Sequence, residues 1–401
     1  MNKRIFIVAF FAFLFLAGSV YAAIGITDLR TELLKSPEGI DVRQPRLSWR
    51  IESDEQNVMQ TAYHILVASS ADLLAQGKGD IWDSGKIESD ASQWIAYQGK
   101  PLKRNACYYW KVKVYTNRGE ADWSTPAFWS MGLLNEADWQ GQWIGLDRAA
   151  PGDSETQWSR LAARYLRKEF ALSKEVKRAT VHIAGMGLYE LFINGQRIGE
   201  QVLAPAPTDY RKTILYNTYD VTPQLQKENA IGVILGNGRF YTMRQNYKPY
   251  KIPTFGYPKL RLNLIVEYTD GSRQTIASDI SWKLTTEGPI RSNNEYDGEE
   301  YDARKELGDW NRAGYDDTNW IPAGRVSIPA GTLRAQMMPG MKVTESLKPV
   351  SIRKQGDKQI LDIGQNMAGW LRIRIKGQAG DSIRLRFAER LQPDGEIFTK
   401  N

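Results

Sequence analysis

The sequence predicts an almost entirely β chain, organised as tandem β-sandwiches. Short alternating or β-branched runs recur along the chain, and Gly, Pro, Asn and Asp turns separate them. Few windows show the 3.6-residue period of a helix, and the clearest helix candidate is the short stretch Ser70 to Gln76. Hydrophobic residues make up 42% of the chain and include 13 tryptophans, enough to fill several cores.

Residues 1–22 have the pattern of a secretory signal peptide. Lys3 and Arg4 precede an apolar run over residues 5–17, and Val20-Tyr21-Ala22 fits a signal-peptidase site, with cleavage before Ala23. The apolar run is shorter than the roughly 20 residues that a bilayer crossing needs. We therefore expect export to the periplasm or medium, without membrane insertion after cleavage, rather than a single-span anchor.

Composition excludes several classes of protein. Cys107 is the only cysteine, so an intramolecular disulfide is impossible. The two histidines, His64 and His182, are not near Cys107 in a metal-ligand spacing, which argues against a usual zinc site. His182 alternates with Val181 and Ile183 and is expected to face outward from a strand. The net charge is +7, or +5 without the signal peptide, and no dense Lys/Arg run indicates a nucleic-acid partner.

The first domain is predicted over residues 23–137. Residues 45–51 and 63–68 are expected as strands, and residues 82–85 as a turn. Residues 108–115 alternate so that Trp110, Val112 and Val114 share one face. Asn117-Arg118-Gly119 then turns the chain. Strands at this spacing predict a small two-sheet sandwich, and their order resembles a fibronectin type III module.

Two further domains are predicted. Over residues 138–335, Asn194-Gly195 and Asp270-Gly271 each separate strand-like runs and indicate hairpins. This domain is expected to be a larger jelly-roll-like sandwich of a carbohydrate-binding-like kind. A third β-domain begins over residues 336–401, with strands expected at 370–375 and 383–387. A sheet of this size buries little surface, so we expect it either to dock on the second domain or to be truncated.

The run YDGEEYDAR, residues 296–304, concentrates four carboxylates: Asp297, Glu299, Glu300 and Asp302. Arg304 can neutralise only one or two of them. In a strand, Asp297, Glu299 and Tyr301 would face one way, and Glu300, Asp302 and Arg304 the other. One interpretation is a charged, solvated edge strand. Another is a sugar-binding or inter-domain surface. A calcium cage is a third, since hard cations take several oxygen ligands.

Six stretches, in order along the chain, carry a resemblance to a known family: 28–51, 108–134, 189–222, 232–241, 296–304 and 362–395. They resemble the N-terminal part of bacterial α-L-rhamnosidases of glycoside hydrolase family 78. The resemblance implies a modular exported enzyme in which accessory β-domains precede an (α/α)6 barrel that hydrolyses terminal α-L-rhamnose with inversion. Both catalytic carboxylates would come from that barrel, so no catalytic residue is assigned here and the chain alone is expected to be inactive. A free-standing carbohydrate-binding or adhesion protein is the alternative.

The resemblance also suggests a rhamnose-containing glycan as partner, beside the missing barrel, and carbohydrate-binding residues. These candidates are Asp209, Asn237, Asp297, Glu299 and Asp302. Asn194 is also a possible cation ligand, although a hairpin turn explains it better. No cofactor is expected to be required, and calcium is possible. Two positions depart from the family: residues 205–208 read Pro-Ala-Pro-Thr instead of Pro-Gly-Trp-Thr, and Arg239 stands where relatives often have an aromatic residue.

Overall fold

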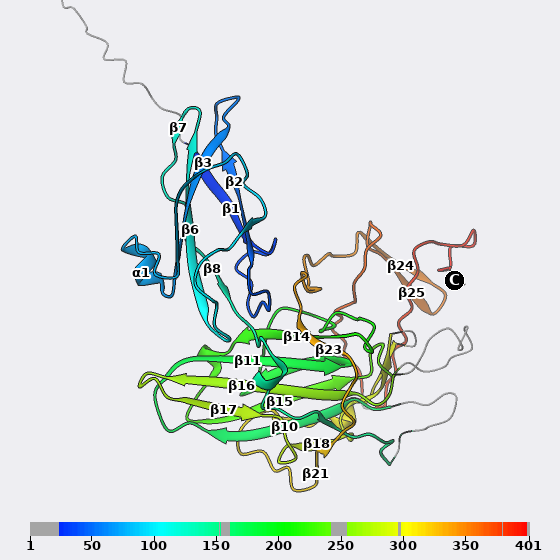
Figure 1. Ribbon diagram of the computed structural model, residues 1–401. Coiled ribbons are helices and arrows are strands. Elements are labelled where there is room, and N and C mark those ends of the chain that lie inside the picture. The colour runs from blue at the N-terminus through cyan, green and yellow to red at the C-terminus, as the bar shows by residue number, and fades with distance from the viewer. Residues whose placement is uncertain are drawn as a thin grey trace, which may run out of the picture. The chain divides into compact units, whose positions relative to one another are not determined.

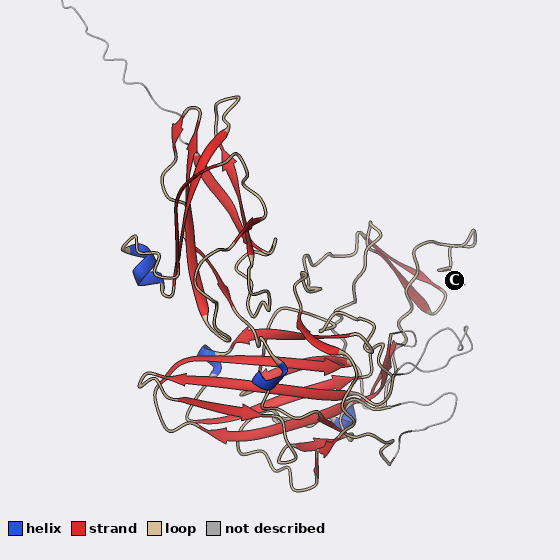
Figure 2. Cartoon of the chain, in the orientation of Figure 1, coloured by secondary structure: helices blue, strands red, loops and turns tan. Residues whose placement is uncertain are grey.

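The computed structural model describes residues 24–151, 153, 161–241, 255–295, 298–378 and 380–398 (Figure 1). The predicted signal peptide lies outside these residues. The chain divides into two compact units, and the boundary falls between Met341 and Lys342. Strands are the main regular secondary structure of the first unit, and the described part of the second contains two strands among loops (Figure 2), which confirms the all-β prediction.

The first sandwich packs a three-stranded sheet against a five-stranded sheet, with strand orders β1-β2-β5 and β4-β3-β6-β7, and β8 pairs with β6. Its core contains Trp49, Trp110 and Trp129, each at most 2% exposed. The predicted helix is present as α1, where Ser70 Oγ accepts from Leu73 N. The elements are β1 (Gly25–Thr31), β2 (Arg46–Glu52), β3 (Gln60–Ala68), α1 (Ala71–Ala75), β4 (Trp82–Glu88), β5 (Ile95–Ala96), β6 (Cys107–Thr116), β7 (Gly119–Glu120) and β8 (Ala127–Ser130).

The turn predicted at residues 82–85 is wrong, because those residues belong to β4. Gly85 has a φ of +60°, and the register between β3 and β4 shifts opposite Ile65. These features describe a β-bulge, which uses the same glycine as a turn does, because both need a left-handed residue. The alternation predicted for β6 is confirmed: Trp110, Val112 and Val114 are fully buried.

The second sandwich consists of two large sheets. One has the strand order β13-β12-β15-β10-β18-β21 and the other β22-β9-β16-β11-β14-β23, with β17 paired to β16. Their elements are η1 (Glu136–Asp138), β9 (Ile144–Gly145), β10 (Arg164–Ala171), β11 (Val176–Met186), β12 (Leu188–Ile193), β13 (Gln196–Arg197), β14 (Thr213–Asp220), η2 (Thr222–Gln224), β15 (Glu228–Gly236), β16 (Lys259–Tyr268), β17 (Arg273–Ala277), β18 (Lys283–Thr285), β21 (Ile321–Pro322), β22 (Gly324–Arg325) and β23 (Thr332–Ala335).

Aliphatic side chains from both large sheets form the core between them, with Val181, Ile183 and Val233 among those fully buried. Both predicted hairpins are present: Asn194-Gly195 joins β12 to β13, and Asp270-Gly271 joins β16 to β17. Asn194 and Gly195 both have positive φ, as a two-residue hairpin turn requires.

The outer face of the β12-β15-β10 sheet is also covered. Tyr165 of β10 packs edge-on against Trp310, with ring centroids 5.2 Å apart. The neighbouring Arg167 is 1% exposed, and its Nε donates to Trp310 O at 2.8 Å. Trp320 completes this smaller core. The segment after the carboxylate motif therefore wraps the sheet instead of projecting into solvent.

His182 corrects the expectation of an outward-facing residue. It does point away from the Val181 and Ile183 core, but it is fully buried. The first sandwich covers it: Asn105, in the loop before β6, accepts a hydrogen bond from its ring. A period of two assigns a residue to a face of the sheet, but it does not reveal that another domain packs on that face.

The second compact unit contains the strands β24 (Ser351–Gln355) and β25 (Lys358–Asp362), which pair antiparallel. The strands predicted at 370–375 and 383–387 are not formed. Their period of two is real, but the structure pairs no strand with either segment, and a strand is stabilised by its cross-strand partner. Their apolar side chains are consequently exposed; for example, Ile375 is 53% exposed and Phe387 69%.

Candidate functional site

Asn237 lies at the end of β15, where the second sandwich meets a separate two-stranded hairpin. This hairpin consists of β19 (Ile290–Asn294) and β20 (Gly298–Tyr301). Asn237 Nδ2 donates to Leu161 O at 2.8 Å and to Asn293 O at 2.9 Å, and Asn237 N donates to Asn293 Oδ1 at 2.7 Å. Asn237 therefore joins three segments that are distant in the sequence. We call Asn237 and Asn293 the amide corner.

Among the residues that the structure describes, each side chain of the amide corner has one buried polar atom without a hydrogen-bond partner. Asn237 is 1% exposed, and its Oδ1 accepts no hydrogen bond. Asn293 Nδ2 is also buried and donates to nothing. An unsatisfied buried polar atom costs about 1–3 kcal/mol, so it calls for an explanation. One atom is a free acceptor and the other a free donor. A hydroxyl group both donates and accepts, so it is chemically suited to either atom.

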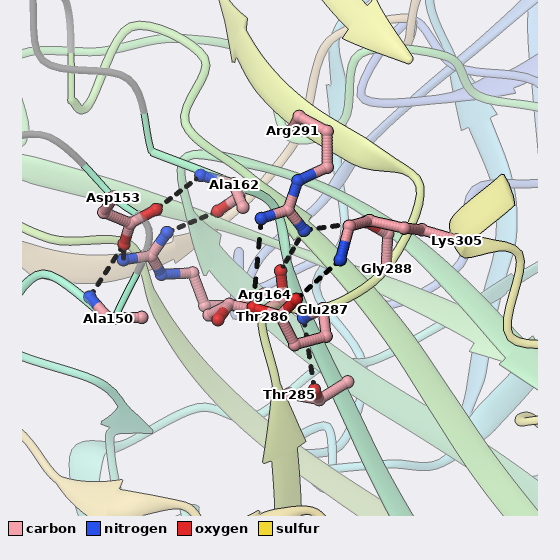
Figure 3. Close-up of polar contacts among 10 residues, drawn as sticks. All are labelled: Ala150, Asp153, Ala162, Arg164, Thr285, Thr286, Glu287, Gly288, Arg291 and Lys305. Carbon is pink, nitrogen blue, oxygen red and sulfur yellow. Dashed lines mark hydrogen bonds and ion pairs between the residues drawn. The ribbon is translucent and has the colours of Figure 1, made fainter. Parts of the chain in front are cut away.

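A buried ion pair fixes the segment beside the amide corner (Figure 3). Arg164 of β10 is fully buried, and its Nη2 lies 3.0 Å from Asp153 Oδ2. Asp153 also accepts from Ala150 N and Ala162 N at 2.8 and 2.9 Å. Burial lowers the pKa of Arg164, and the Asp153 charge opposes that shift. Because the guanidinium donates to Ala162 O, the pair positions the backbone next to Leu161, which Asn237 contacts.

The described part of the carboxylate motif forms β20 and the turn η4 (Ala303–Lys305). Residues 298–301 are exposed, and β20 pairs only with β19. Asp302 caps η4 and accepts two hydrogen bonds from Arg304, whose Nε and Nη2 both lie 2.8 Å from the carboxylate. These bonds hold the pKa of Asp302 at about 2. Asp297, the candidate in the middle of the motif, lies outside the described residues.

Glu299 lies across the hairpin from the amide corner, because its Cα is the cross-strand partner of the Asn293 Cα. Partial loss of solvent raises the pKa of Glu299, and the nearby charge of Glu190 raises it further. Glu190 belongs to β12 and pairs with Arg197 at 3.4 Å. Of the described carboxyl candidates, Glu299 is the one whose pKa is raised, and part of that shift comes from a residue more than one hundred positions earlier in the chain.

Ion pairs hold the base of the hairpin. Glu287 lies 2.8 Å from Lys305 Nζ and 3.9 Å from Arg291 Nη2 (Figure 3). Arg291 also donates to the backbone oxygens of Thr286 and Gly288, at 2.6 and 3.0 Å. The hydrogen bond from Lys305 and the charge of Arg291 lower the pKa of Glu287. The hairpin is therefore anchored at both ends, with the amide corner at one end and this network at the other.

Two other candidates lie in local turns. Asp209 pairs with Arg211 at 3.0 Å, and this contact lowers its pKa. Asn194 is buried in the β12–β13 turn, where its Nδ2 donates to Gln224 O and Asn229 Oδ1 and its Oδ1 accepts from Ala230 N. All polar atoms of its side chain are satisfied, which agrees with the hairpin explanation. Arg239 forms a 3.6 Å ion pair with Glu295, beside the amide corner.

Sequence reasoning missed Asn293, Asp153 and Arg164. No motif marks them: Asn293 and its partner Asn237 are 56 residues apart, and Asp153 and Arg164 are 11 residues apart. Within the described ranges, no group of three or more His, Cys, Asp or Glu side chains is arranged to hold a metal ion. Among those same residues, no helix has the length and apolarity that a membrane crossing requires. The described part of the chain is therefore a modular protein of β-sandwiches, and the amide corner lies in the second sandwich.

Three family models match the chain in succession. They are described as a Rha78A-like N-terminal immunoglobulin domain over residues 26–135, an α-L-rhamnosidase N-terminal domain over 174–345, and a bacterial α-L-rhamnosidase concanavalin-like domain over 352–401. An α-L-rhamnosidase of Formosa agariphila is 39% identical over 90% of this chain, which covers 40% of that protein. The chain belongs with the N-terminal domains of the bacterial α-L-rhamnosidases of glycoside hydrolase family 78.

Solved structures of α-L-rhamnosidases are also similar to this chain. The Aspergillus terreus α-L-rhamnosidase matches with a TM-score of 0.84 and 32% identity, over 94% of this chain and 42% of that one. The Streptomyces avermitilis α-L-rhamnosidase, solved in complex with L-rhamnose, also has a TM-score of 0.84, with 26% identity over 94% of this chain and 52% of that one. The chain thus spans about half or less of the length of these relatives.

Proposed function

We propose that this chain is the non-catalytic front part of an exported α-L-rhamnosidase that removes terminal α-L-rhamnose from glycans or glycosides. In this proposal, the β-domains form a scaffold and the second sandwich binds substrate sugar at the amide corner. The observation that carries the sugar-binding part is the pair of unsatisfied buried amide atoms at Asn237 and Asn293. A hydroxyl of a sugar supplies the donor and the acceptor that these atoms lack.

Glu299 and the Arg239–Glu295 pair lie next to this corner and offer further groups for sugar hydroxyls. Asp302 and Asp209 are less suited to the role, because Arg304 and Arg211 already occupy their carboxylates. Calcium binding at this site is a separate proposal, and it is based on the acidic composition of residues 296–304. Any such ion would draw on Asp297 and on backbone oxygens, since hard cations accept both ligand types.

Inverting hydrolysis needs a carboxylic acid and a carboxylate base roughly 6.5–9.5 Å apart. We propose that both belong to a helical barrel in the whole protein and that this chain alone is inactive. An aryl α-L-rhamnoside assay on residues 23–401 should show no turnover above buffer, whereas turnover that follows the purified protein would overturn this division of labour. The DNA after the codon for Asn401 gives a second test: a frame that encodes a barrel supports an enzyme, and a stop supports a free-standing binding protein.

Export is part of the proposal and rests on the three-part pattern of residues 1–22. N-terminal sequencing of protein recovered from the native cell should begin at or near Ala23. Recovery of protein that still begins at Met1 would reject export by this route.

A further inference from the structure

Trp94 is an exposed and strained residue of the first sandwich. Its side chain is 45% exposed and it directly precedes β5. Its φ is +60°, and it is the only aromatic residue with positive φ in the described ranges. Bulky residues avoid this left-handed conformation, and they keep it only where the surroundings impose it. Something must therefore hold Trp94 in place.

Strand β2 holds the backbone on both sides of Trp94. Trp94 N donates to Ser48 Oγ at 3.1 Å, and Trp49 N donates to Ser92 O at 3.0 Å. After Trp94, Ile95 pairs with Leu47 in the β2–β5 ladder. The strained residue is consequently pinned between two anchored neighbours.

A second group fixes the indole ring. The Arg46 guanidinium carbon lies 4.1 Å from the centroid of the ring, a cation–π distance. Arg46 is itself immobilised by Glu32, which is 8% exposed: Arg46 N and Nε donate to Glu32 Oε1 at 2.7 and 3.0 Å.

The core of the first sandwich contains Trp49, Trp110 and Trp129, and Trp94 lies outside it. A strained backbone and a fixed, partly exposed aromatic ring at the surface are features of a preorganised binding surface.

We propose that Trp94 and Arg46 form a stacking platform for one pyranose ring of a glycan, distinct from the amide corner. A pyranose has an apolar C–H face, which fits a flat aromatic ring. The Arg46 guanidinium lies over one face of the indole and braces the ring, and we place the sugar on the opposite face. The proposal depends on the proposed function only for the glycan nature of the ligand.

Affinity electrophoresis of the whole chain through gels that contain rhamnogalacturonan I, a rhamnose-rich polysaccharide, tests this platform. The wild type should be retarded relative to a gel without polysaccharide. Trp94→Ala should weaken the apparent affinity roughly tenfold, which corresponds to the loss of one good stacking contact. Trp94→Phe should retain most of the retardation. Met59→Ala, at an exposed apolar residue of the same sandwich, should behave as wild type.

Trp94→Gly separates binding from folding, because glycine tolerates a φ of +60°. This variant should unfold at a temperature no lower than that of the wild type and should still lose the retardation. Unchanged retardation of Trp94→Ala or Trp94→Gly would overturn the proposal, and so would a wild type that is not retarded. The same electrophoresis of Asn237→Ala, which alters the amide corner and leaves Trp94 intact, should keep the retardation that Trp94 provides. Failure at either site can therefore be distinguished.

Discussion

The imidazole of His182 in the second sandwich lies 3.0 Å, through Nε2, from Oδ1 of Asn105 in the first. Its Nδ1 lies 2.9 Å from Thr218 Oγ1. We assign the neutral tautomer with the proton on Nε2, because Nε2 can then donate to the amide oxygen and Nδ1 accept from the hydroxyl. Asn105 Nδ2 in turn contacts Glu267 at 3.3 Å. One neutral histidine thus joins the two sandwiches.

We predict that this junction makes stability depend on pH. Burial lowers the pKa of His182 to about 3, and the charge of Arg178 adds to the shift. A depressed folded-state pKa means that the contribution is complete above the unfolded pKa of about 6.5 and is lost as pH falls toward 3. At pH 5 the loss should be about 2 kcal/mol. Denaturant unfolding from pH 7.5 to 5 would measure it.

His182→Gln is the control for that experiment, since glutamine keeps polar contacts but does not titrate. Glu38 faces the same junction, where it accepts from Asp220 N at 3.0 Å, and its pKa is raised, chiefly by burial. That shift has the opposite sign, because it favours folding below the raised pKa. The difference between wild type and variant isolates His182, and parallel pH curves would contradict the prediction.

We predict that Gly132→Ala loosens the same junction. A Cβ at Gly132 would lie closer than 3.0 Å to Tyr216 Oη and to Gly39 O. Tyr216 and Leu133 exchange two hydrogen bonds of 3.1 Å there, so neither side can move freely. Overpacking of this kind should cost about 1–3 kcal/mol. Gly324→Ala is a matched control, because its Cβ would meet only Gly145 O, at 3.4 Å. Equal melting temperatures for the two variants would count against a tight junction.

We predict that removal of Asp153 is strongly destabilising. Asp153→Ala leaves the Arg164 guanidinium buried without its partner, which should cost about 3–5 kcal/mol of unfolding free energy. Asp309→Ala removes an Asp–Arg contact of similar length, 3.1 Å to Arg312, but at an exposed site. That change should cost at most about 1 kcal/mol. Chemical denaturation of both variants checks the contrast, which would fail if Asp153→Ala unfolded like Asp309→Ala.

Local signals predicted much of the fold. Asn194-Gly195 and Asp270-Gly271 are hairpins because the turn needs left-handed residues, a property that the dipeptide itself carries. The alternation of residues 108–115 predicted the buried face of β6, because successive side chains point to opposite faces. The same rule did not predict that His182 is buried or that residues 370–375 form no strand. Both outcomes depend on what packs or pairs beside the segment.

The amide corner was only half predictable. Asn237 was one of the candidates that the family resemblance suggested, but its partner Asn293 follows 56 residues later, in a strand without a distinctive motif. Asp209 and Asp302 were chosen for their charge, yet each is occupied by the arginine two residues later. Composition identifies where charge is dense, whereas the hydrogen bonds that remain unmade are a property of the tertiary fold.

The role of the amide corner is tested most directly by calorimetric titration of the purified chain with L-rhamnose. Asn293→Asp is the sharpest variant, because its carboxylate can still accept from Asn237 N but lacks the free donor. Asn237→Ala removes the free acceptor, and Asp302→Ala, at a carboxylate already bound by Arg304, is the control. A parallel titration with chelator, followed by added calcium, reports any cation requirement.

We predict weak binding by the wild type, since a monosaccharide has few atoms with which to offset the cost of association. Asn293→Asp and Asn237→Ala should each lose at least ~1 kcal/mol of binding free energy, while Asp302→Ala should change it by less than about 0.5 kcal/mol. Binding that is unaffected in both asparagine variants, or no binding of L-rhamnose by the wild-type chain, would contradict a sugar site at the amide corner.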